Sequence, residues 1–255
     1  MFHYMSLVPS AFRKIADGSK IIELRLNDEK RQRIAEGDTI VFSQIGNGDI
    51  AVASVKKLHR FSDFAELYEA LPLEKCGYES TEVEAAHHSD MERFYSKEDI
   101  AKYGVLGIEL CGVYSICDVK DRLFRDDVLP LLAPSVYNPT PERLQARAEK
   151  YSSDPDVRVY AYKDSEYKGI VVLGLGHNVA TILDIAVSPD FRGQGIGNRL
   201  VDYVKDKINP KKIIAETDDD AVLFYKKYGF KATPIKTDYD CNRYSCILEV
   251  NSKSN

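Results

Sequence analysis

Residues 182–203 contain a glycine-rich turn whose backbone N–H groups could bind an anion. An apolar run, 182–187, carries a single acid, Asp184, and ends at Pro189. A glycine-rich turn then precedes an amphipathic helical pattern, and its residues are Arg192, Gly193, Gln194, Gly195, Ile196 and Gly197. A strand, a glycine turn and a helix in this order aim successive backbone N–H groups and the positive end of the helix dipole at one point. The segment therefore predicts a site for a phosphate or pyrophosphate.

The residues around the glycines distinguish the known kinds of anion-binding turn. The nucleotide P-loop needs a Lys followed by Ser or Thr, and the dinucleotide fingerprint spaces its glycines differently. The order Arg-x-x-Gly-x-Gly, starting at Arg192, resembles instead the acetyl-CoA signature of the GNAT acetyltransferase superfamily. This resemblance implies acetyl-CoA as cofactor, with backbone N–H groups of the turn on its pyrophosphate and added charge from Arg192. It also implies that the strand ending at Ala186 and Val187 splays from its neighbour and hydrogen-bonds the pantetheine arm.

Residues 221–230 carry a second part of this resemblance, with the sequence Ala-Val-Leu-Phe-Tyr-Lys-Lys-Tyr-Gly-Phe. They are similar to the superfamily's Ala-x-x-Leu-Tyr-x-x-x-Gly-Phe, which implies that Tyr225 is the general acid for the leaving thiolate. A phenol with a pKa of ~10 is protonated at neutral pH and can donate its proton. The alternative is that Tyr225 only packs beside Phe224. Asp218 stands where the family often has Asn, which bears on how the pantetheine arm is held.

Acyl transfer to an amine also needs a route for the amine proton. Asp184 lies on the predicted strand beside the cofactor, and Glu216 ends the next predicted strand. Both are candidate general bases because a positioned carboxylate can accept a proton during the reaction. Each acid is equally well explained as a structural charge, and Thr181 occupies a place where some relatives carry a catalytic Glu. Release of the proton to water is a further alternative.

A second group of charged residues lies near the N-terminus, in the strand-like segment 20–26. Lys20, Glu23 and Arg25 are spaced so that the three charges could meet in one concavity, which would suit a base or a phosphate. The alternative is a solvated strand face with a surface salt bridge of small energetic weight. Spacing alone favours the solvated strand face over a ligand site.

The pattern Gly-x-Lys-x-x-Glu-x-Arg, which begins at Gly18, resembles the signature of ASCH domains, a branch of the PUA-like barrels. Residues 37–42 and 103–109 fit the same family. The resemblance implies an RNA- or nucleoside-binding cleft at the three charged residues. In some small members it implies a Lys-based amidohydrolase that acts on acetylated cytidine. The motif of those members resembles Gly-x-Lys-x-x-Thr, whereas this chain has Glu23 at the position of the Thr.

Periodicity places these motifs in two domains, 1–112 and 113–255. In the first domain, alternation and turn residues predict strands, and the 3.6-residue period predicts short helices. The predicted strands are 20–26, 39–42, 50–58 and 105–110, and the predicted helices are 10–18, 61–71 and 91–102. Because strands dominate, we expect a small PUA-like β-barrel with peripheral helices.

The second domain is predicted to combine strands and helices around the glycine turn. Its predicted helices are 121–132, 141–151, 198–207 and 219–228, and its predicted strands are 113–118, 157–162, 167–176, 181–187, 212–216 and two within 230–250. This order resembles the GNAT α/β fold, a mixed central sheet flanked by helices. The whole chain is therefore predicted to be an α+β protein of two domains, with no linker rich in Pro, Gly or Ser between them.

Composition limits the remaining function classes. The formal net charge of −5 disfavours strong nonspecific binding of nucleic acid over the whole surface. No apolar run approaches the ~20 residues of a membrane helix, and the N-terminus shows no signal-peptide pattern. The 5 cysteines include no CxxC pair, which predicts reduced thiols in a cytoplasmic protein. No metal site is predicted, because His87 and His88 have no further ligands at recognisable spacing.

Together these features predict an acetyl-CoA-dependent N-acyltransferase that moves an acetyl group to an amine, joined to an ASCH module that binds RNA or a nucleoside. The expected acceptor is a small molecule, a protein or an aminoacyl-tRNA, and the expected assembly is a monomer or a homodimer. Two alternatives stay open. The chain is an RNA- or nucleoside-binding protein whose GNAT domain senses CoA without turnover, or it is an ASCH amidohydrolase acting on acetylated cytidine.

Overall fold

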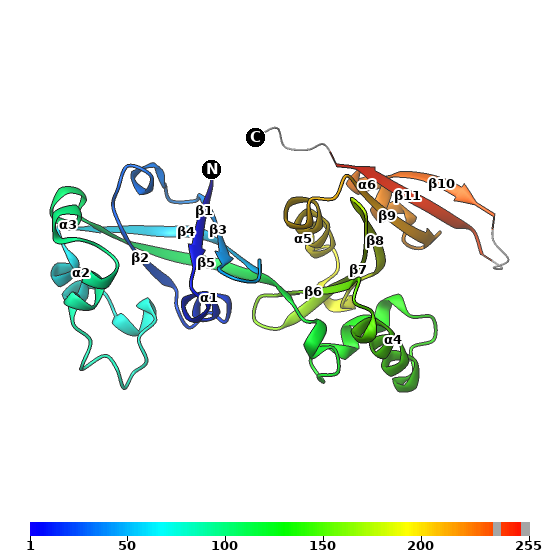
Figure 1. Cartoon of the computed structure of the whole chain (residues 1–255), viewed down its shortest axis with the longest axis horizontal. Coiled ribbons are helices and arrows are strands. Elements are labelled where there is room, and N and C mark those ends of the chain that lie inside the picture. The colour runs from blue at the N-terminus through cyan, green and yellow to red at the C-terminus, as the bar shows by residue number, and fades with distance from the viewer. Residues whose placement is uncertain (237–240, 251–255) are drawn as a thin grey trace. The chain divides into compact units, whose positions relative to one another are not determined.

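The computed structural model describes residues 1–236 and 241–250 and divides into two compact units (Figure 1). Unit 1 spans Met1–Ser115, and unit 2 spans Ile116–Asn255. Both units combine strands with helices. The predicted α+β fold with two successive folded parts is confirmed.

One strand, β5 (Val105–Asp118), carries the chain from the first unit into the second. The prediction of two separate strands, 105–110 and 113–118, is therefore wrong in this detail. Gly112 adopts a φ of +60° within the strand, a conformation open to a residue without a side chain. The composition change at this position marks a local irregularity in one strand and no connecting loop.

Unit 1 is a small strand-rich fold. Its strands besides β5 are β1 (Phe2–Leu7), β2 (Ile22–Leu26), β3 (Thr39–Gln44) and β4 (Ile50–Phe61). Its α-helices are α1 (Pro9–Ala16), α2 (Phe64–Ala70) and α3 (Lys97–Tyr103), and its 3₁₀ turns are η1 (Arg31–Arg33), η2 (Leu73–Cys76) and η3 (His88–Arg93). The strands follow the order β1-β3-β4-β5, and β2 also pairs with β5. One apolar cluster packs α2 against β2, which fixes the strand that carries the charged residues.

Strand β1 is an element that the sequence did not reveal. It runs parallel to β3, with His3, Met5 and Leu7 buried, while Phe2 and Tyr4 are exposed. Because aromatic residues also occupy the exposed face, the strand lacks the clean alternation of apolar and polar residues that predicts a strand. The carbonyl oxygens of Tyr4 and Ser6 accept hydrogen bonds of 3.3 Å from the side chains of Lys30 and Arg25 respectively. Two long cations thus cover polar backbone groups of this edge strand.

Unit 2 holds a mixed sheet with the strand order β6-β7-β8-β9-β11-β10. The strands are β6 (Val157–Lys163), β7 (Tyr167–Gly176), β8 (Val179–Val187), β9 (Lys212–Asp218), β10 (Lys231–Ile235) and β11 (Arg243–Glu249). The α-helices are α4 (Pro141–Ser153), α5 (Ile196–Tyr203) and α6 (Val222–Tyr228). Only β8 and β9 pair in parallel among the strand pairs recorded for the described part of unit 2. This parallel pair lies at the middle of the strand order and positions the candidate site.

The predicted helix 121–132 is wrong. Two 3₁₀ turns, η4 (Lys120–Arg122) and η5 (Leu129–Ser135), occupy this region instead. Pro130 and Pro134 lie within η5, and proline has no N–H for an α-helical hydrogen bond. Four of the apolar residues still belong to the core of unit 2, namely Leu123, Val128, Leu131 and Leu132, whereas Phe124 is exposed.

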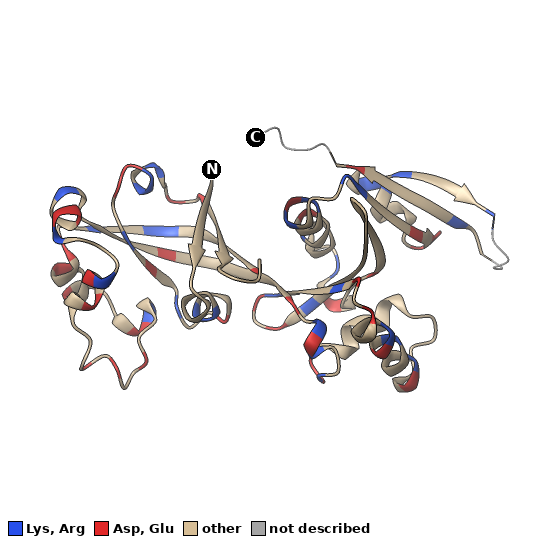
Figure 2. Cartoon of the chain, in the orientation of Figure 1, with Lys and Arg blue, Asp and Glu red and all other residues tan. Residues whose placement is uncertain are grey.

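The distribution of charged residues and the length of the helices bear on what the protein can contact. Figure 2 shows acidic and basic residues interspersed along the ribbons of both units. Among the residues that the structure describes, no helix has both the length and the apolar character needed to span a membrane.

Candidate functional site in unit 2

The parallel strands β8 and β9 pair along only part of their length. Their register runs from Val179 opposite Lys212 to Ile182 opposite Ala215. Beyond that point β9 continues beside β11, with Asp218 opposite Arg243. The end of β8 continues beside β7. The two strands therefore separate, as expected for the strand that ends at Ala186 and Val187.

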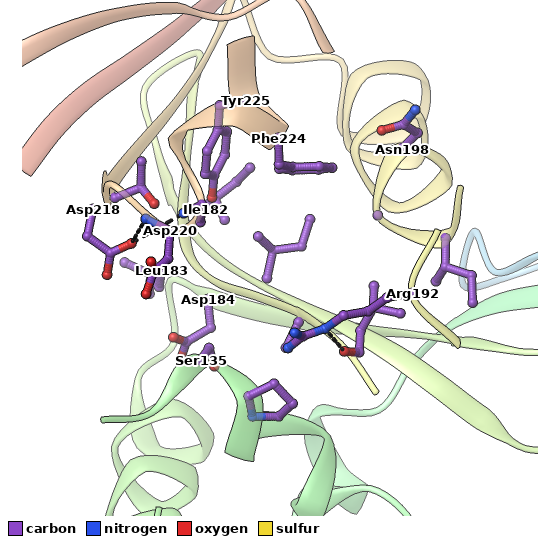
Figure 3. Close-up of a pocket in the computed structure, with 18 of the residues that line it drawn as sticks. Ser135, Ile182, Leu183, Asp184, Arg192, Asn198, Asp218, Asp220, Phe224 and Tyr225 are labelled. Atoms are coloured by element: carbon purple, nitrogen blue, oxygen red, sulfur yellow. Dashed lines mark hydrogen bonds between the residues drawn. The ribbon is translucent and has the colours of Figure 1, made fainter. Parts of the chain in front are cut away.

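A cleft of about 880 Å³ opens where the two strands separate (Figure 3). Its walls come from β8, the glycine turn, the start of α5, the end of β9 and α6. The predicted site residues that line it are Asp184, Ala186, Val187, Arg192, Gly193, Gly195, Ile196, Gly197, Glu216, Asp218 and Tyr225. Gln194, predicted to belong to the same site, is exposed and is not among the lining residues. One cleft thus brings together residues from sequence segments about thirty positions apart.

The glycine turn enters α5 through two residues in the left-handed region. Gly193 has a φ of +79°, and Gly195, the N-cap of α5, has a φ of +77°. A side chain at either position would be strained. Gly197 is constrained differently, because a Cβ atom there would lie 2.9 Å from Cε2 of Phe224. The turn is further tied to β8 by a 3.3 Å hydrogen bond from Nε of Arg192 to the carbonyl oxygen of Val187 (Figure 3).

Tyr225 and Phe224 extend from α6 into this region (Figure 3). Tyr225 is buried, and its burial raises the pKa of the phenol above its ordinary value. Negative charge on Asp184 and Asp218 raises the pKa of Tyr225 further. The phenol is therefore protonated throughout the neutral range, as a proton donor must be.

The acids of the cleft differ in their surroundings. Asp184 is buried, and its carboxylate receives Nε and Nη2 of Arg147 at 2.9 and 2.7 Å and the hydroxyl of Tyr151. These contacts favour the interpretation of Asp184 as a structural charge over that of a base. Glu216 is exposed on the cleft wall. Asp218 accepts the backbone N–H groups of Asp220 and Ala221 at 3.1 and 3.3 Å.

Arg147 and Tyr151 belong to the site, although the sequence did not point to them. They lie one helical turn apart on α4, on either side of the buried residue Ala148. Two polar side chains at i and i+4 on a buried helix face are a readable signal. They reach β8 next to a bulge, where Asp184 lies opposite Val172 and Ile182 opposite Leu173. Leu183 is the extra residue of that bulge, and bulges commonly redirect side chains near active sites.

The three charged residues predicted in unit 1 do meet. Nζ of Lys20 lies 2.9 Å from Oε2 of Glu23, and Nε of Arg25 lies 2.8 Å from Oε1. The Glu23 side chain is only 4% exposed, so the alternative of a solvated strand face is wrong. Cys76 lies near these charges, and its burial raises the pKa of its thiol to about 11. Charge on Lys20 lowers the Cys76 pKa and charge on Glu23 raises it.

Comparison with protein families matches each unit separately. Residues 5–111 match the model of the ASCH domain. Residues 155–232 match the model described as acetyltransferase (GNAT) domain, and they contain the glycine turn, both separated strands and Tyr225. The chain carries an ASCH domain followed by a GNAT domain. The first match contains Lys20, Glu23 and Arg25, and the second lies within unit 2.

One curated relative and two solved structures are each similar to part of this chain. An acetyltransferase of Pectobacterium atrosepticum is 32% identical over 88 residues, which cover 32% of this chain and 62% of the relative. The chain thus spans less than two thirds of that protein. A solved hypothetical protein is 34% identical with a TM-score of 0.35, over 43% of this chain and 97% of its own. An aminoglycoside 6'-N-acetyltransferase complexed with coenzyme A is 17% identical with a TM-score of 0.47, over 55% and 99%.

Proposed function

We propose that the chain is an acetyl-CoA-dependent N-acyltransferase that transfers an acetyl group to an amine in the cleft of unit 2. The observation that carries this proposal is the separation of β8 from β9 beside the glycine turn, with the buried Tyr225 on the same cleft. A separated strand end offers unpaired backbone groups, and the turn offers N–H donors for an anion. One elongated ligand with amide groups and a pyrophosphate would use both.

Each part of the cleft has a role in holding the donor. Acetyl-CoA, when bound, supplies a thioester carbonyl for attack by the amine nitrogen. The backbone N–H groups of Gly193, Gly195 and Gly197 would hold the pyrophosphate, and Arg192 would add positive charge. The backbone of Ala186 and Val187 would hydrogen-bond the pantetheine arm. Gln194 is not among the lining residues, so we assign its side chain no contact with the donor.

The proton transfers involve two further residues. A C–N bond forms as the C–S bond breaks, and Tyr225 gives its proton to the leaving thiolate. The amine loses a proton, and Glu216 is the better placed acceptor because it lies exposed on the cleft wall. Asp184 is engaged by Arg147 and Tyr151, so its role in this proposal is to orient those side chains.

Isothermal titration with acetyl-CoA tests the proposal directly. We expect saturable binding by the full chain, and Arg192→Ala to weaken it about tenfold through the loss of a charge-assisted contact. Arg13→Ala is a matched control, because Arg13 is exposed in unit 1. The absence of binding at millimolar acetyl-CoA would exclude the acyltransferase. Binding without release of free CoA across a broad set of amines would favour the alternative of a CoA-sensing protein.

We propose for unit 1 that the cluster of Lys20, Glu23 and Arg25 contacts RNA or a nucleoside. Support comes from the ASCH match and from two cations held against one buried carboxylate. Fluorescence anisotropy with single-stranded RNA at fixed ionic strength tests this, and Arg25→Ala should weaken binding. Binding that is unchanged in this variant would contradict the assignment. Incubation with acetylated cytidine tests the alternative of an amidohydrolase, which predicts release of acetate.

A further inference from the structure

We propose that Arg147 recognises the acceptor by binding an oxygen atom next to the reacting amine, an inference that rests on the acyltransferase proposed above. The acceptor class would be α-amino carbonyl compounds, which are amino acids, their amides and the amino ends of peptides. Simple alkylamines lack this oxygen and would be poorer acceptors.

The first step is that the Arg147 guanidinium is held in one orientation. Its Nε and Nη2 atoms donate to the two carboxylate oxygens of Asp184, at 2.9 and 2.7 Å, in a fork that a planar guanidinium fits. The Tyr151 hydroxyl also donates to the carboxylate, at the oxygen Oδ2 that Nε of Arg147 contacts, and so restrains it further. Arg147 is therefore preorganised before any acceptor arrives.

The second step is that stability alone does not account for this arrangement. Asp184 alternates along β8 with the buried apolar residues Ile182 and Ala186. Burying an ion pair costs desolvation energy, and apolar residues of similar volume are often as stable or more stable. What apolar residues cannot provide is a donor of fixed direction. A role for Arg147 as such a donor explains why the pair stands in an apolar setting.

The third step is that Arg147 and the proposed general acid Tyr225 line the same cleft. The Arg147 side chain is 37% exposed and lines the same cleft as Ser135 and Tyr225. The charge of Asp184 contributes to the raised pKa of Tyr225, so the two side chains are close enough to interact electrostatically. An acceptor whose nitrogen lies beside the thioester near Tyr225 would place neighbouring atoms toward Arg147.

The fourth step concerns the charge of the recognised oxygen. Asp184 offsets the positive charge of Arg147, so the guanidinium acts as a directional donor more than as a free cation. Such a donor suits a neutral carbonyl oxygen as well as a carboxylate oxygen. Glu216 is exposed on the cleft wall and suits the ammonium form of the arriving amine. The two sources of oxygen are separated by experiment.

The test measures kcat/KM by release of free CoA with three amines of similar size: L-alaninamide, L-alanine and isopropylamine. Arg147→Lys keeps a cation beside Asp184 but loses the fork. We expect the ratio of kcat/KM for L-alaninamide or L-alanine to that for isopropylamine to fall about tenfold or more in this variant. The comparison of this ratio between variant and wild type cancels the intrinsic reactivity of each amine. A fall for the amide alone assigns the carbonyl, and a fall for the acid alone assigns the carboxylate.

Equal losses for all three amines would overturn the inference, because a merely structural role does not distinguish acceptors. Arg143→Lys on the same helix is the matched control, since Arg143 is exposed and not among the cleft-lining residues. The triple variant Arg147→Met, Asp184→Leu, Tyr151→Phe removes the whole network without leaving a buried charge, and it should show the same change of ratio.

A measurement without turnover completes the test. Binding of N-acetyl-L-alaninamide to the CoA-loaded protein should weaken about tenfold in Arg147→Lys. Equal binding by wild type and variant would also overturn the inference. Failure of the acyltransferase proposal is distinguishable, because it appears as absent acetyl-CoA binding in the titration described above, whereas failure of this inference leaves that binding intact.

Discussion

Each unit of the chain buries one carboxylate of a strand among cations or donors, but the two clusters are built differently. In unit 1, Glu23 lies between Lys20 and Arg25, all within six residues of one segment. In unit 2, Asp184 is held by Arg147 and Tyr151 from a helix more than thirty residues earlier. The Lys20 side chain is 12% exposed, whereas that of Arg147 is 37% exposed beside a cleft.

The Glu23 and Asp184 clusters depend on different parts of the fold. In the local cluster, Glu23 and Arg25 share one face of β2 because strand side chains alternate, and Lys20 reaches them from the residues just before the strand. A cluster between a helix and a strand forms only after the two elements pack against each other, and it then depends on their relative position. The Asp184 cluster can therefore couple α4 to the cleft that it borders. Variants of the two clusters should therefore have different consequences.

The largest expected effect is on the stability of unit 2. Arg147→Met leaves the buried Asp184 with the Tyr151 hydroxyl but without its guanidinium partner, which should lower the free energy of unfolding of unit 2 by about 2–3 kcal/mol. Arg25→Met leaves Glu23 paired with Lys20 at 2.9 Å, so unit 1 should lose only about 1–2 kcal/mol. Hydrogen exchange resolves the two units separately in urea. Equal losses in both units would break the comparison.

The next effect is on turnover. Tyr225→Phe should lower kcat by about a hundredfold with acetyl-CoA affinity retained, because it removes only the proposed general acid. Burial raises the Tyr225 pKa, so the protonated, active phenol persists to a pH above its ordinary ~10. The wild-type kcat should therefore not fall between pH 8 and about 10 through this group. An unchanged kcat in Tyr225→Phe would assign the residue to packing beside Phe224.

A smaller effect separates glycines of the two units. Gly197→Ala places a Cβ 2.9 Å from the Phe224 ring at the cleft wall, and overpacking of this size should weaken acetyl-CoA binding about tenfold. Gly77→Ala meets the flexible Lys20 side chain at 2.9 Å, at a φ of +102°. It should cost unit 1 stability but leave acetyl-CoA binding unchanged. Titration calorimetry checks both, and weaker binding in Gly77→Ala would contradict the separation.

The smallest expected effect is on the alkylation rate of Cys76, which lies near the charges of the unit 1 cluster. Burial raises the Cys76 pKa to about 11, so its alkylation at pH 8 should be slow compared with the exposed Cys111. Glu23→Gln removes a charge that raises the Cys76 pKa while Lys20 remains, so the pKa should fall and alkylation should quicken a few-fold. Mass spectrometry of timed alkylation measures each rate. Slower alkylation of Cys76 in this variant would reverse the inferred sign.

The sequence predicted the parts of the site that local chemistry determines. The glycine turn, the neighbouring strands and Tyr225 border one cleft, because a strand, a turn and a helix in this order place them there. Gln194 could not be separated from its neighbours, since side-chain direction within a turn depends on the φ of the adjacent glycines. The catalytic and binding roles of these residues stay predictions, as do the domain limits 1–112 and 113–255.

The parts that the sequence did not predict depend on contacts between distant segments. The partners of Asp184 lie on α4, and no local pattern indicates which strand residue a helix side chain reaches. Helical periodicity in 121–132 gave the wrong element, because Pro130 lacks the N–H of an α-helical hydrogen bond. Of the apolar residues there, Leu123, Val128, Leu131 and Leu132 are buried, whereas Phe124 is exposed. Strand β1 escaped notice because its exposed face carries Phe2 and Tyr4.

That exposed face has a consequence for the behaviour of the protein at high concentration. An edge strand with aromatic residues and open carbonyl groups is a template for pairing with another molecule. Lys30 and Arg25 occupy the Tyr4 and Ser6 carbonyl oxygens and place positive charge along this edge. Glu23 offsets the charge of Arg25, so we expect Lys30 to supply most of the repulsion between two such edges. Concentrated salt, which screens that repulsion, is the condition under which self-association through β1 should first appear.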